Sequence, residues 1–270
     1  MCRLFAYAAP LNGSVTSQLG DDGMARIMAL AQLHADGWGW SAVAGAQAGH
    51  PVVFKSAAPA GEGDTFSQVL GREAPAAMVH LRWATLGLPV AEVNTHPFLM
   101  EGLSFEHNGS LKPISLIRSL LSDTSLKGLQ GTTDSEMYFA LIREGIAAGR
   151  SLADATVFTA HLLRQHFPTS SLNSVLLSSE SLVVVHSNAA TRLAGDDLDE
   201  ASQFDLPMEH TEDYFALRWH RKSDGTVLVA SSGLAESHWD AIPQETVMIV
   251  TLSDCSVRMI PITELALSSS

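Results

Sequence analysis

The second residue of the chain, Cys2, is placed for nucleophilic chemistry. Removal of Met1 would put a thiol and a free α-amine on the same residue. A cysteine in that position can attack an acyl carbon while its own amine manages the proton, so it needs no separate histidine base. Position alone favours an ordinary cysteine that happens to fall early in the chain. The case for catalysis therefore depends on the residues that accompany it.

Two later segments carry groups that could bind and polarise an acyl substrate. The segment 80–85 (HLRWAT) puts Arg82 at the end of a predicted strand, where its guanidinium could pair with a substrate carboxylate or with a surface acid. The segment 106–109 (EHNG) ends another predicted strand, and Asn-Gly is ordinarily a turn dipeptide. The Asn108 amide and the Gly109 backbone N–H are nevertheless two donors suited to an oxyanion.

Three further segments have both a structural and a functional interpretation. In 132–136 (TTDSE), Asp134 fits a helix cap as well as a site for a substrate ammonium. In 34–40 (HADGWGW), the glycines permit close backbone approach, and packing is the default role of Trp38. In 94–98 (NTHPF), the proline holds His96 in extended geometry, which favours a structural histidine over a general base.

In combination these segments resemble class II glutamine amidotransferases, which belong to the N-terminal-nucleophile hydrolases. The resemblance is carried, in the order seen in that family, by Cys2, DGWG at 36–39, RWAT at 82–85, NTHPF at 94–98, HNG at 107–109 and TDSE at 133–136. The RWAT and HNG elements look particularly like the glutaminase domain of glucosamine phosphate synthase. Each motif is weak alone, and six in order are strong.

The resemblance implies an α+β fold, a four-layer αββα sandwich in which two antiparallel sheets lie between helical layers. It also implies roles for the residues. Cys2 would be the nucleophile with its α-amine as the base, and Asn108 with Gly109 would hold the oxyanion. The substrate-binding residues it implies are Arg82 and Thr85 for the α-carboxylate, Asp134 for the α-ammonium, and Trp83 and His107, with Trp38 and His96 as possible pocket residues.

The function implied is hydrolysis of glutamine or another γ-glutamyl amide through a thioester on Cys2. A small-molecule γ-glutamyl compound is then the substrate, and no cofactor or metal is expected. Two alternatives remain open: a glutaminase subunit that passes ammonia to a separate synthetase or γ-glutamyl-pathway partner, and a non-catalytic sensor of glutamine or γ-glutamyl compounds. We expect one amidotransferase domain over residues 1–267, with 268–270 as a frayed tail.

The elements that must position these residues follow from the hydrophobic pattern. Helical periodicity is clear around Ile27, Ile142 and Leu162, and the last two helices run consecutively in the middle of the chain. Two hairpins are predicted near the C-terminus, with turns at 223–225 and 253–254. Further strands are predicted at 4–8, 38–43, 52–56, 77–83, 103–107, 175–177 and 182–186.

Composition excludes several classes of partner. The formal charge of −13 repels phosphate backbones and anionic membrane surfaces, so we expect neither nucleic acid nor membrane as a partner. No stretch approaches the roughly 18 apolar residues that a membrane span needs, and the apolar stretch before Asn12 is too short for the h-region of a signal peptide. Two cysteines, 2 and 255, are expected as thiols in a cytoplasmic protein.

Overall fold

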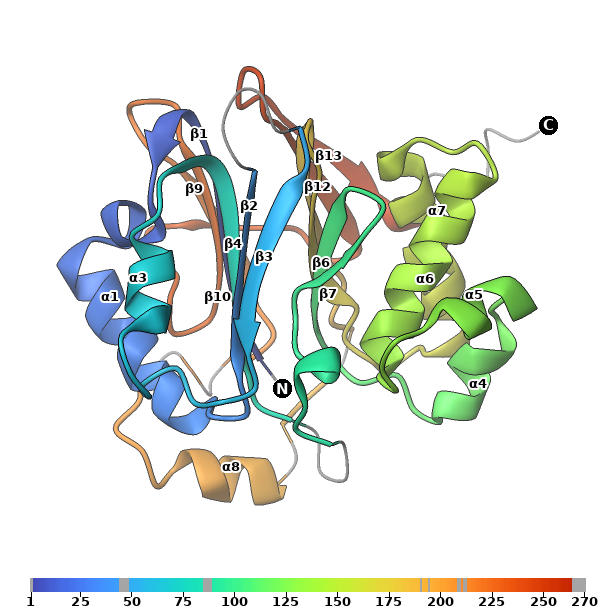
Figure 1. Cartoon of the computed structure of the whole chain (residues 1–270), viewed down its shortest axis with the longest axis horizontal. Coiled ribbons are helices and arrows are strands. Elements are labelled where there is room, and N and C mark those ends of the chain that lie inside the picture. The colour runs from blue at the N-terminus through green and yellow to red at the C-terminus, as the bar shows by residue number, and fades with distance from the viewer. Residues whose placement is uncertain are drawn as a thin grey trace.

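Two antiparallel β-sheets pack face to face, and helices cover the outer face of each (Figure 1). The computed structural model describes residues 2–43, 49–84, 89–189, 191–193, 195–207, 210 and 213–263. In spatial order the first sheet contains β11 (Asp240–Ala241), β9 (Leu217–Arg221), β10 (Val227–Ser231), β1 (Cys2–Gly13), β4 (Ala74–Arg82), β2 (Trp38–Val43) and β3 (Pro51–Ser56). The second contains β13 (Val257–Pro261), β12 (Thr246–Thr251), β8 (Ser181–His186), β7 (Asn173–Leu177), β6 (Leu103–Asn108) and β5 (Phe98–Met100).

The helices form the outer layers of the sandwich. In Figure 1, α1 (Val15–Leu33) and α3 (Thr65–Leu70) lie against the first sheet. The second sheet is covered by α4 (Ile114–Ser119), α5 (Asp123–Gly128), α6 (Asp134–Ala147) and α7 (Leu152–His166). A short 3-10 helix, η1 (Glu92–Asn94), precedes β5, and α8 (Gly195–Ala201) lies at one end of the molecule. The predicted four-layer αββα architecture is confirmed.

Alternation along the strands builds three separate apolar layers. In β1, Phe5 and Tyr7 pack outward against the helices α1 and α3, whereas Leu4 and Ala6 pack inward between the sheets. Successive strand residues point to opposite faces, so one buried strand can serve two layers. The second sheet repeats the arrangement, with alternate residues of β8 in the inner layer and under α6 and α7. Even-numbered positions of β1 therefore face the second sheet.

Side-chain caps fix where the two central helices begin. Thr133 caps α6, since its hydroxyl accepts from the backbone N–H of Glu136 at 3.2 Å. Ser151 caps α7 by accepting from the N–H of Asp154 at 3.1 Å. The cap at Thr133 makes Asp134 the first helical residue and therefore places its carboxylate at the end of α6.

Most predicted strands and both C-terminal hairpins are confirmed, and the differences are short elements. The hairpins are β9 with β10 and β12 with β13, each antiparallel. The strands β5 and β11 and the helices α3, α4 and α5 have six residues or fewer and were not predicted. In such segments the hydrophobic pattern covers less than two helical turns, too little to separate helix from strand or loop.

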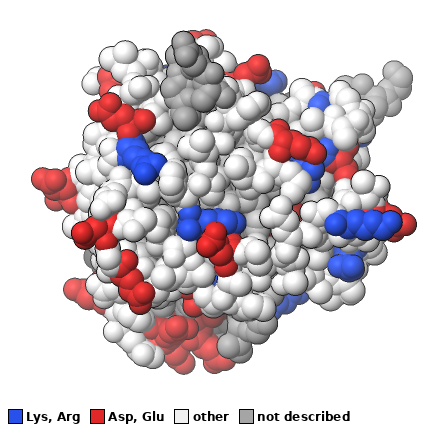
Figure 2. Space-filling model, viewed as in Figure 1, with Lys and Arg blue, Asp and Glu red and all other residues white. Residues whose placement is uncertain are grey.

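The helix α8 lies in a strongly acidic part of the chain. Its sequence includes Asp196, Asp197, Asp199 and Glu200, and Figure 2 shows acidic side chains gathered at the end of the molecule where α8 lies in Figure 1. Within the part of the chain that the structure describes, no helix combines the length and the apolar character needed to cross a membrane.

Candidate active site

Strand register brings three chemistry-bearing residues to one end of the inner face of the first sheet. In the antiparallel pair β1 and β4, Cys2 lies opposite Arg82 and Leu4 lies opposite His80. Leu4 belongs to the inner apolar layer, so Cys2 faces the second sheet, and His80 is its diagonal neighbour on that face. The first sheet alone therefore supplies a thiol, an imidazole and a guanidinium.

The second sheet brings Asn108 to the same point from the opposite side. The backbone N–H of Cys2 donates to Asn108 Oδ1 at 2.9 Å, which joins the start of β1 to the end of β6. Asn108 is completely buried, and its Nδ2 has no hydrogen-bond partner among the described residues. A buried, unpartnered donor beside a nucleophile is what an acyl oxyanion would require. After removal of Met1, the nitrogen bound to Oδ1 would be an α-amine.

Gly109 follows Asn108 in a tight passage where no side chain fits. A Cβ atom there would overlap the Ser171 carbonyl oxygen and the His107 ring. His107 itself is held at both nitrogens, with Nδ1 2.9 Å from Ser135 Oγ and Nε2 3.1 Å from the Ser171 carbonyl oxygen. These partners indicate that Nε2 carries the proton and that Nδ1 accepts from the Ser135 hydroxyl. Burial lowers the His107 pKa, in keeping with a neutral ring.

The predicted substrate-binding role of His107 is therefore joined by a structural one. Its ring ties the end of β6 to Ser135 on α6 and to the chain before β7. The Ser171 hydroxyl adds a 2.7 Å hydrogen bond to the Asn108 carbonyl oxygen. Asp134, at the start of α6, accepts from the backbone N–H of Leu111. Together these contacts fix residues 108–111 against the beginning of α6.

Arg82 points into the pocket without a carboxylate partner among the described residues. Its guanidinium donates to two backbone oxygens, those of Asp36 at 3.4 Å and Pro89 at 3.2 Å. The Asp36 carboxylate accepts from the N–H of Ala84 at 2.7 Å and so secures the turn after β4. Because only neutral acceptors hold it, the Arg82 guanidinium remains available to an anionic group.

The Cys2 thiol lies in surroundings that favour the thiolate. Burial alone would raise its pKa, but the charge of His80, a hydrogen bond with His80 and the backbone N–H of Trp83 act in the opposite direction. The net effect lowers the Cys2 pKa to about 6, so the thiolate predominates at neutral pH. The thiolate is the nucleophilic form of cysteine.

Most of the predicted site residues line one small pocket of about 30 Å³, and Asn108 adjoins it through its contact with Cys2. Its walls include Cys2, Arg82, Trp83, Ala84, Asn94, His96, His107, Gly109, Thr133, Asp134 and Ser135. Thr85 lies outside the described residues. Trp38 was considered a possible pocket residue, but its ring packs 5.1 Å from Phe66 in the outer apolar layer and does not line this pocket. Among the described residues, no three histidine, cysteine or acidic side chains are grouped to hold a metal ion.

Several contributors lie inside the motifs but were not singled out from sequence. Asn94 lines the pocket and accepts from the Thr132 N–H through Oδ1 at 3.0 Å. His80 and Asp36 lie close in sequence to residues that were predicted to belong to the site. Strand register shows that His80 is diagonally opposite Cys2, and a hydrogen bond joins Asp36 to Ala84. Glu106, two residues before Asn108 on the same face of β6, is completely buried with both carboxyl oxygens unpartnered among the described residues.

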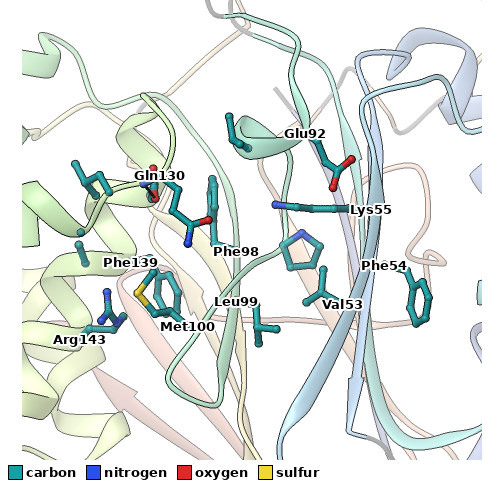
Figure 3. Close-up of a pocket in the computed structure, with 16 residues that line it drawn as sticks. Val53, Phe54, Lys55, Glu92, Phe98, Leu99, Met100, Gln130, Phe139 and Arg143 are labelled. Atoms are coloured by element: carbon teal, nitrogen blue, oxygen red, sulfur yellow. Dashed lines mark hydrogen bonds between the residues drawn. The ribbon is translucent and has the colours of Figure 1, made fainter.

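A larger pocket, of about 450 Å³, is lined by residues adjacent in sequence to those of this site, among them Val93 and Pro97, and none of its lining residues is a cysteine. Figure 3 shows Lys55 reaching from β3 towards Phe98, with Glu92 beside it and Phe139 on the opposite side. The Lys55 ammonium donates to the Thr95 carbonyl oxygen at 2.8 Å. This contact links the larger pocket to the chain that carries His96.

Comparison with curated proteins gives relatives that are similar over part of their length. The chain is 27% identical over 236 residues to the probable glutamine amidotransferase DUG3 of Saccharomyces cerevisiae, covering 74% of this chain and 64% of that protein. It is 32% identical over 92 residues to glutamine–fructose-6-phosphate aminotransferase of Aliivibrio fischeri, covering 34% of this chain and 15% of that protein. The chain thus spans less than two thirds of these relatives.

Solved structures share the fold at low sequence identity. A glutamine phosphoribosylpyrophosphate amidotransferase from B. subtilis superposes with a TM-score of 0.66 at 14% identity, covering 97% of this chain and 50% of that one. A glutamine aminotransferase class-II domain protein from Silicibacter pomeroyi gives a TM-score of 0.61 at 14% identity, covering 96% and 100%. The family model described as glutamine amidotransferases class-II matches residues 1–264. With this match over nearly its whole length, the chain belongs to the class II glutamine amidotransferases.

Proposed function

We propose that the protein hydrolyses glutamine or a larger γ-glutamyl amide through a γ-glutamyl thioester on Cys2. The observation that carries the proposal is the contact of Cys2 N with Asn108 Oδ1 at 2.9 Å, which leaves Asn108 Nδ2 buried and unpartnered beside the thiol. One amide side chain can then orient the terminal amine through its oxygen and receive an oxyanion through its nitrogen.

Substrate orientation follows from the two charged groups of the pocket. Arg82 is suited to the α-carboxylate because its planar guanidinium can form two parallel hydrogen bonds with a carboxylate. Asp134 is suited to the α-ammonium, since the carboxylate lines the pocket at the start of α6. When Arg82 and Asp134 hold the charged head group, the side chain of the glutamyl group extends away from them with its γ-carbonyl at the far end. Cys2 lines the same pocket.

The reaction proceeds in two acyl transfers. Cys2 Sγ adds to the γ-carbonyl carbon, and the developing oxyanion accepts hydrogen bonds from Asn108 Nδ2 and the Gly109 N–H. The C–N bond then breaks as the α-ammonium of Cys2 gives its proton to the departing nitrogen, which leaves a thioester. Water gives a proton to the same amine as it attacks the thioester, which releases the γ-carboxylic acid and returns Cys2 to its starting state, a thiolate with a protonated α-amine.

The decisive experiment is a hydrolysis screen over glutamine, glutathione and other γ-glutamyl amides, with Cys2→Ala as the blank. We expect the wild-type protein to release glutamate from at least one of these compounds and Cys2→Ala to release none. Rapid acid quenching followed by intact-mass measurement should trap one γ-glutamyl group on Cys2. Full activity in Cys2→Ala would refute the proposed mechanism.

The same experiment separates the other functions that the family allows. An amidotransferase that supplies a separate synthetase would release ammonia from glutamine and leave larger γ-glutamyl amides intact. A sensor would bind a γ-glutamyl compound stoichiometrically without turnover. Intact mass also tests the amine's role: the active protein should lack Met1, and an active sample that retains Met1 throughout would exclude the α-amine as acid and base.

A further inference from the structure

The pocket of about 450 Å³ beside the active site has the size and the walls of a small-molecule site. Ligand pockets usually enclose roughly 300–1,000 Å³ and combine apolar walls with a few polar groups. This one is lined by residues of β3 and β5, the last strands of the two sheets, and by residues of α6. It shares no lining residue with the pocket of Cys2, so a ligand there would not occupy the place of the glutamyl group.

Four charged side chains line this larger pocket, and two of them are already paired. The Arg143 guanidinium donates to both oxygens of the Glu101 carboxylate, at 2.7 and 3.2 Å. The two oxygens of Glu136 accept from backbone N–H groups, those of Gln130 at 2.7 Å and Gly131 at 2.8 Å. Arg143 and Glu136 therefore hold the walls of the pocket and are not free to pair with a ligand.

The other two charged side chains, Lys55 and Glu92, form no ion pair with any described residue. Lys55 Nζ donates to the Thr95 carbonyl oxygen at 2.8 Å, which leaves two of its three N–H donors without a partner among the described residues. Figure 3 shows Glu92 beside the Lys55 side chain. Burial lowers the pKa of Lys55, and the charge of Glu92 is the first influence that opposes this. The pocket thus presents one free cation and one free anion close together.

The rest of the pocket is largely apolar and open to a covering group. Phe98, Leu99 and Met100 of β5 and Phe139 of α6 contribute to its walls. Figure 3 shows Phe139 and Met100 across the pocket from Lys55. Leu99 is 44% exposed, so part of this apolar surface is in contact with water. Covering it with an apolar group would be favourable, since the free energy gained scales with the apolar area removed from water.

We propose that this pocket binds a free α-amino acid with an apolar side chain, such as leucine or phenylalanine. The carboxylate of the ligand pairs with Lys55, its ammonium pairs with Glu92, and its side chain covers the apolar wall. An α-amino acid carries its two charged groups on one carbon atom, which suits a cation and an anion that lie side by side. A ligand with only one of these charges would leave either Lys55 or Glu92 without a counter-ion.

The segment 93–97 contributes residues to both pockets. Val93 and Pro97 line the larger pocket, whereas Asn94 and His96 line the pocket of Cys2. Lys55 holds this segment through its hydrogen bond to the carbonyl oxygen of residue 95. The amino acid therefore contacts the active site from behind this segment and does not compete with the substrate for Cys2.

Calorimetric titration of the wild-type protein with matched probes tests the class of ligand. L-Leucine is compared with 4-methylpentanoate, which lacks the ammonium, and with 3-methylbutylamine, which lacks the carboxylate. Leucine should bind once per chain, and each truncated probe should bind at least about tenfold more weakly because one charged contact is lost. Absence of saturable binding of both leucine and phenylalanine would overturn the proposal, as would equal affinity for leucine and the two truncated probes.

Two variants assign the charged contacts. Lys55→Met should weaken leucine binding at least about tenfold and leave the affinity for 3-methylbutylamine unchanged, whereas Glu92→Gln should weaken leucine binding and spare 4-methylpentanoate. Lys112→Met and Glu62→Gln are matched controls, since both residues are exposed and line neither pocket. If the loss of the Lys55 hydrogen bond unfolds the first variant, Glu92→Gln decides, because Glu92 is exposed and its carboxylate bonds to no described residue. Wild-type affinity for leucine in Glu92→Gln would refute the proposal.

The pocket of Arg82 could itself hold the head group of an amino acid, and one comparison separates the two sites. Arg82→Met should keep its affinity for leucine, and Cys2→Ala saturated with glutamine should still bind leucine, because the two pockets have no residue in common. Loss of leucine binding in Arg82→Met, or displacement of leucine by glutamine, would refute the proposal. None of these measurements requires turnover, so a failed hydrolysis screen and a failed leucine site are distinguishable.

Discussion

Replacing Asn108 with alanine should slow catalysis strongly while leaving stability nearly unchanged. The side chain is completely buried, accepts one hydrogen bond from Cys2 N at 2.9 Å, and leaves Nδ2 without a partner among the described residues. In the free enzyme the Asn108 side chain therefore accepts a hydrogen bond through Oδ1, whereas Nδ2 makes none with the described residues. Such an arrangement is expected where a group is selected for a charge that appears only during the reaction.

The expected changes in the free energy of unfolding and in kcat both follow from these contacts. Loss of the hydrogen bond should destabilise the protein by about 1 kcal/mol, whereas removal of a buried unpartnered donor should relieve ~1–3 kcal/mol. The cavity left by the truncation offsets part of that relief, so the free energy of unfolding should stay within ~1 kcal/mol of wild type. Loss of one oxyanion donor should lower kcat by roughly 100- to 1,000-fold, with KM little changed because Arg82 and Asp134 hold the head group.

The assay pairs steady-state kinetics on the best substrate of the screen with urea unfolding of the same samples. Asn173→Ala is a matched control, since Asn173 lies directly opposite Asn108 on β7 and has both ends of its amide bonded, to the Phe215 carbonyl oxygen and the Ser187 N–H. It should lose ~1–3 kcal/mol of stability and keep kcat within a few-fold. A kcat for Asn108→Ala within tenfold of wild type would refute the oxyanion assignment.

Three further predictions concern the Arg82 guanidinium, the buried Glu106 carboxyl group and the tight turn at Gly109. Arg82→Lys should raise KM about tenfold or more, because an ammonium cannot form the bidentate pair, and the increase should vanish for a substrate lacking the α-carboxylate. Burial raises the Glu106 pKa well above its usual value, so ionisation of this carboxyl group at neutral pH opposes folding and Glu106→Gln should stabilise the protein at pH 7. That gain should shrink as the pH falls towards 4.5, and urea unfolding at pH 5 and 7 that gave equal gains would contradict it. Gly109→Ala should lower both kcat and melting temperature because its Cβ overlaps the Ser171 carbonyl oxygen, whereas Gly128→Ala, with open space around it, should change neither measurably.

The four-layer arrangement was predicted from the family resemblance, whereas the apolar pattern predicted the longer helices and strands individually. The strand at 38–43 was predicted with the bounds that β2 has, and the acidic start of α6 at Asp134 was read from its capping pattern. β5 and β11 could not be predicted in the same way. A strand of three residues, such as β5, exists because β6 offers it hydrogen bonds, and that partner is invisible in a local window.

The residues of the site, too, could be predicted only in part from the sequence. Cys2, Arg82 and Asn108 lie in motifs that can be read from the chain, and they line or adjoin one pocket in the structure. The positions of His80 and Glu106 follow instead from strand register and from which face of each strand is inward. A shift of one residue would turn both side chains to the other face, and local sequence does not determine that choice.

These two residues interrupt the apolar character of the inner layer. Away from the site, the space between the sheets is filled by apolar side chains such as Leu4, Met78 and Val184. Near Cys2 the same layer carries His80 and Glu106, whose buried polar atoms lack partners and lower the stability of the fold. In surroundings of such low polarity, a polar group without a partner costs more free energy than the same group near water.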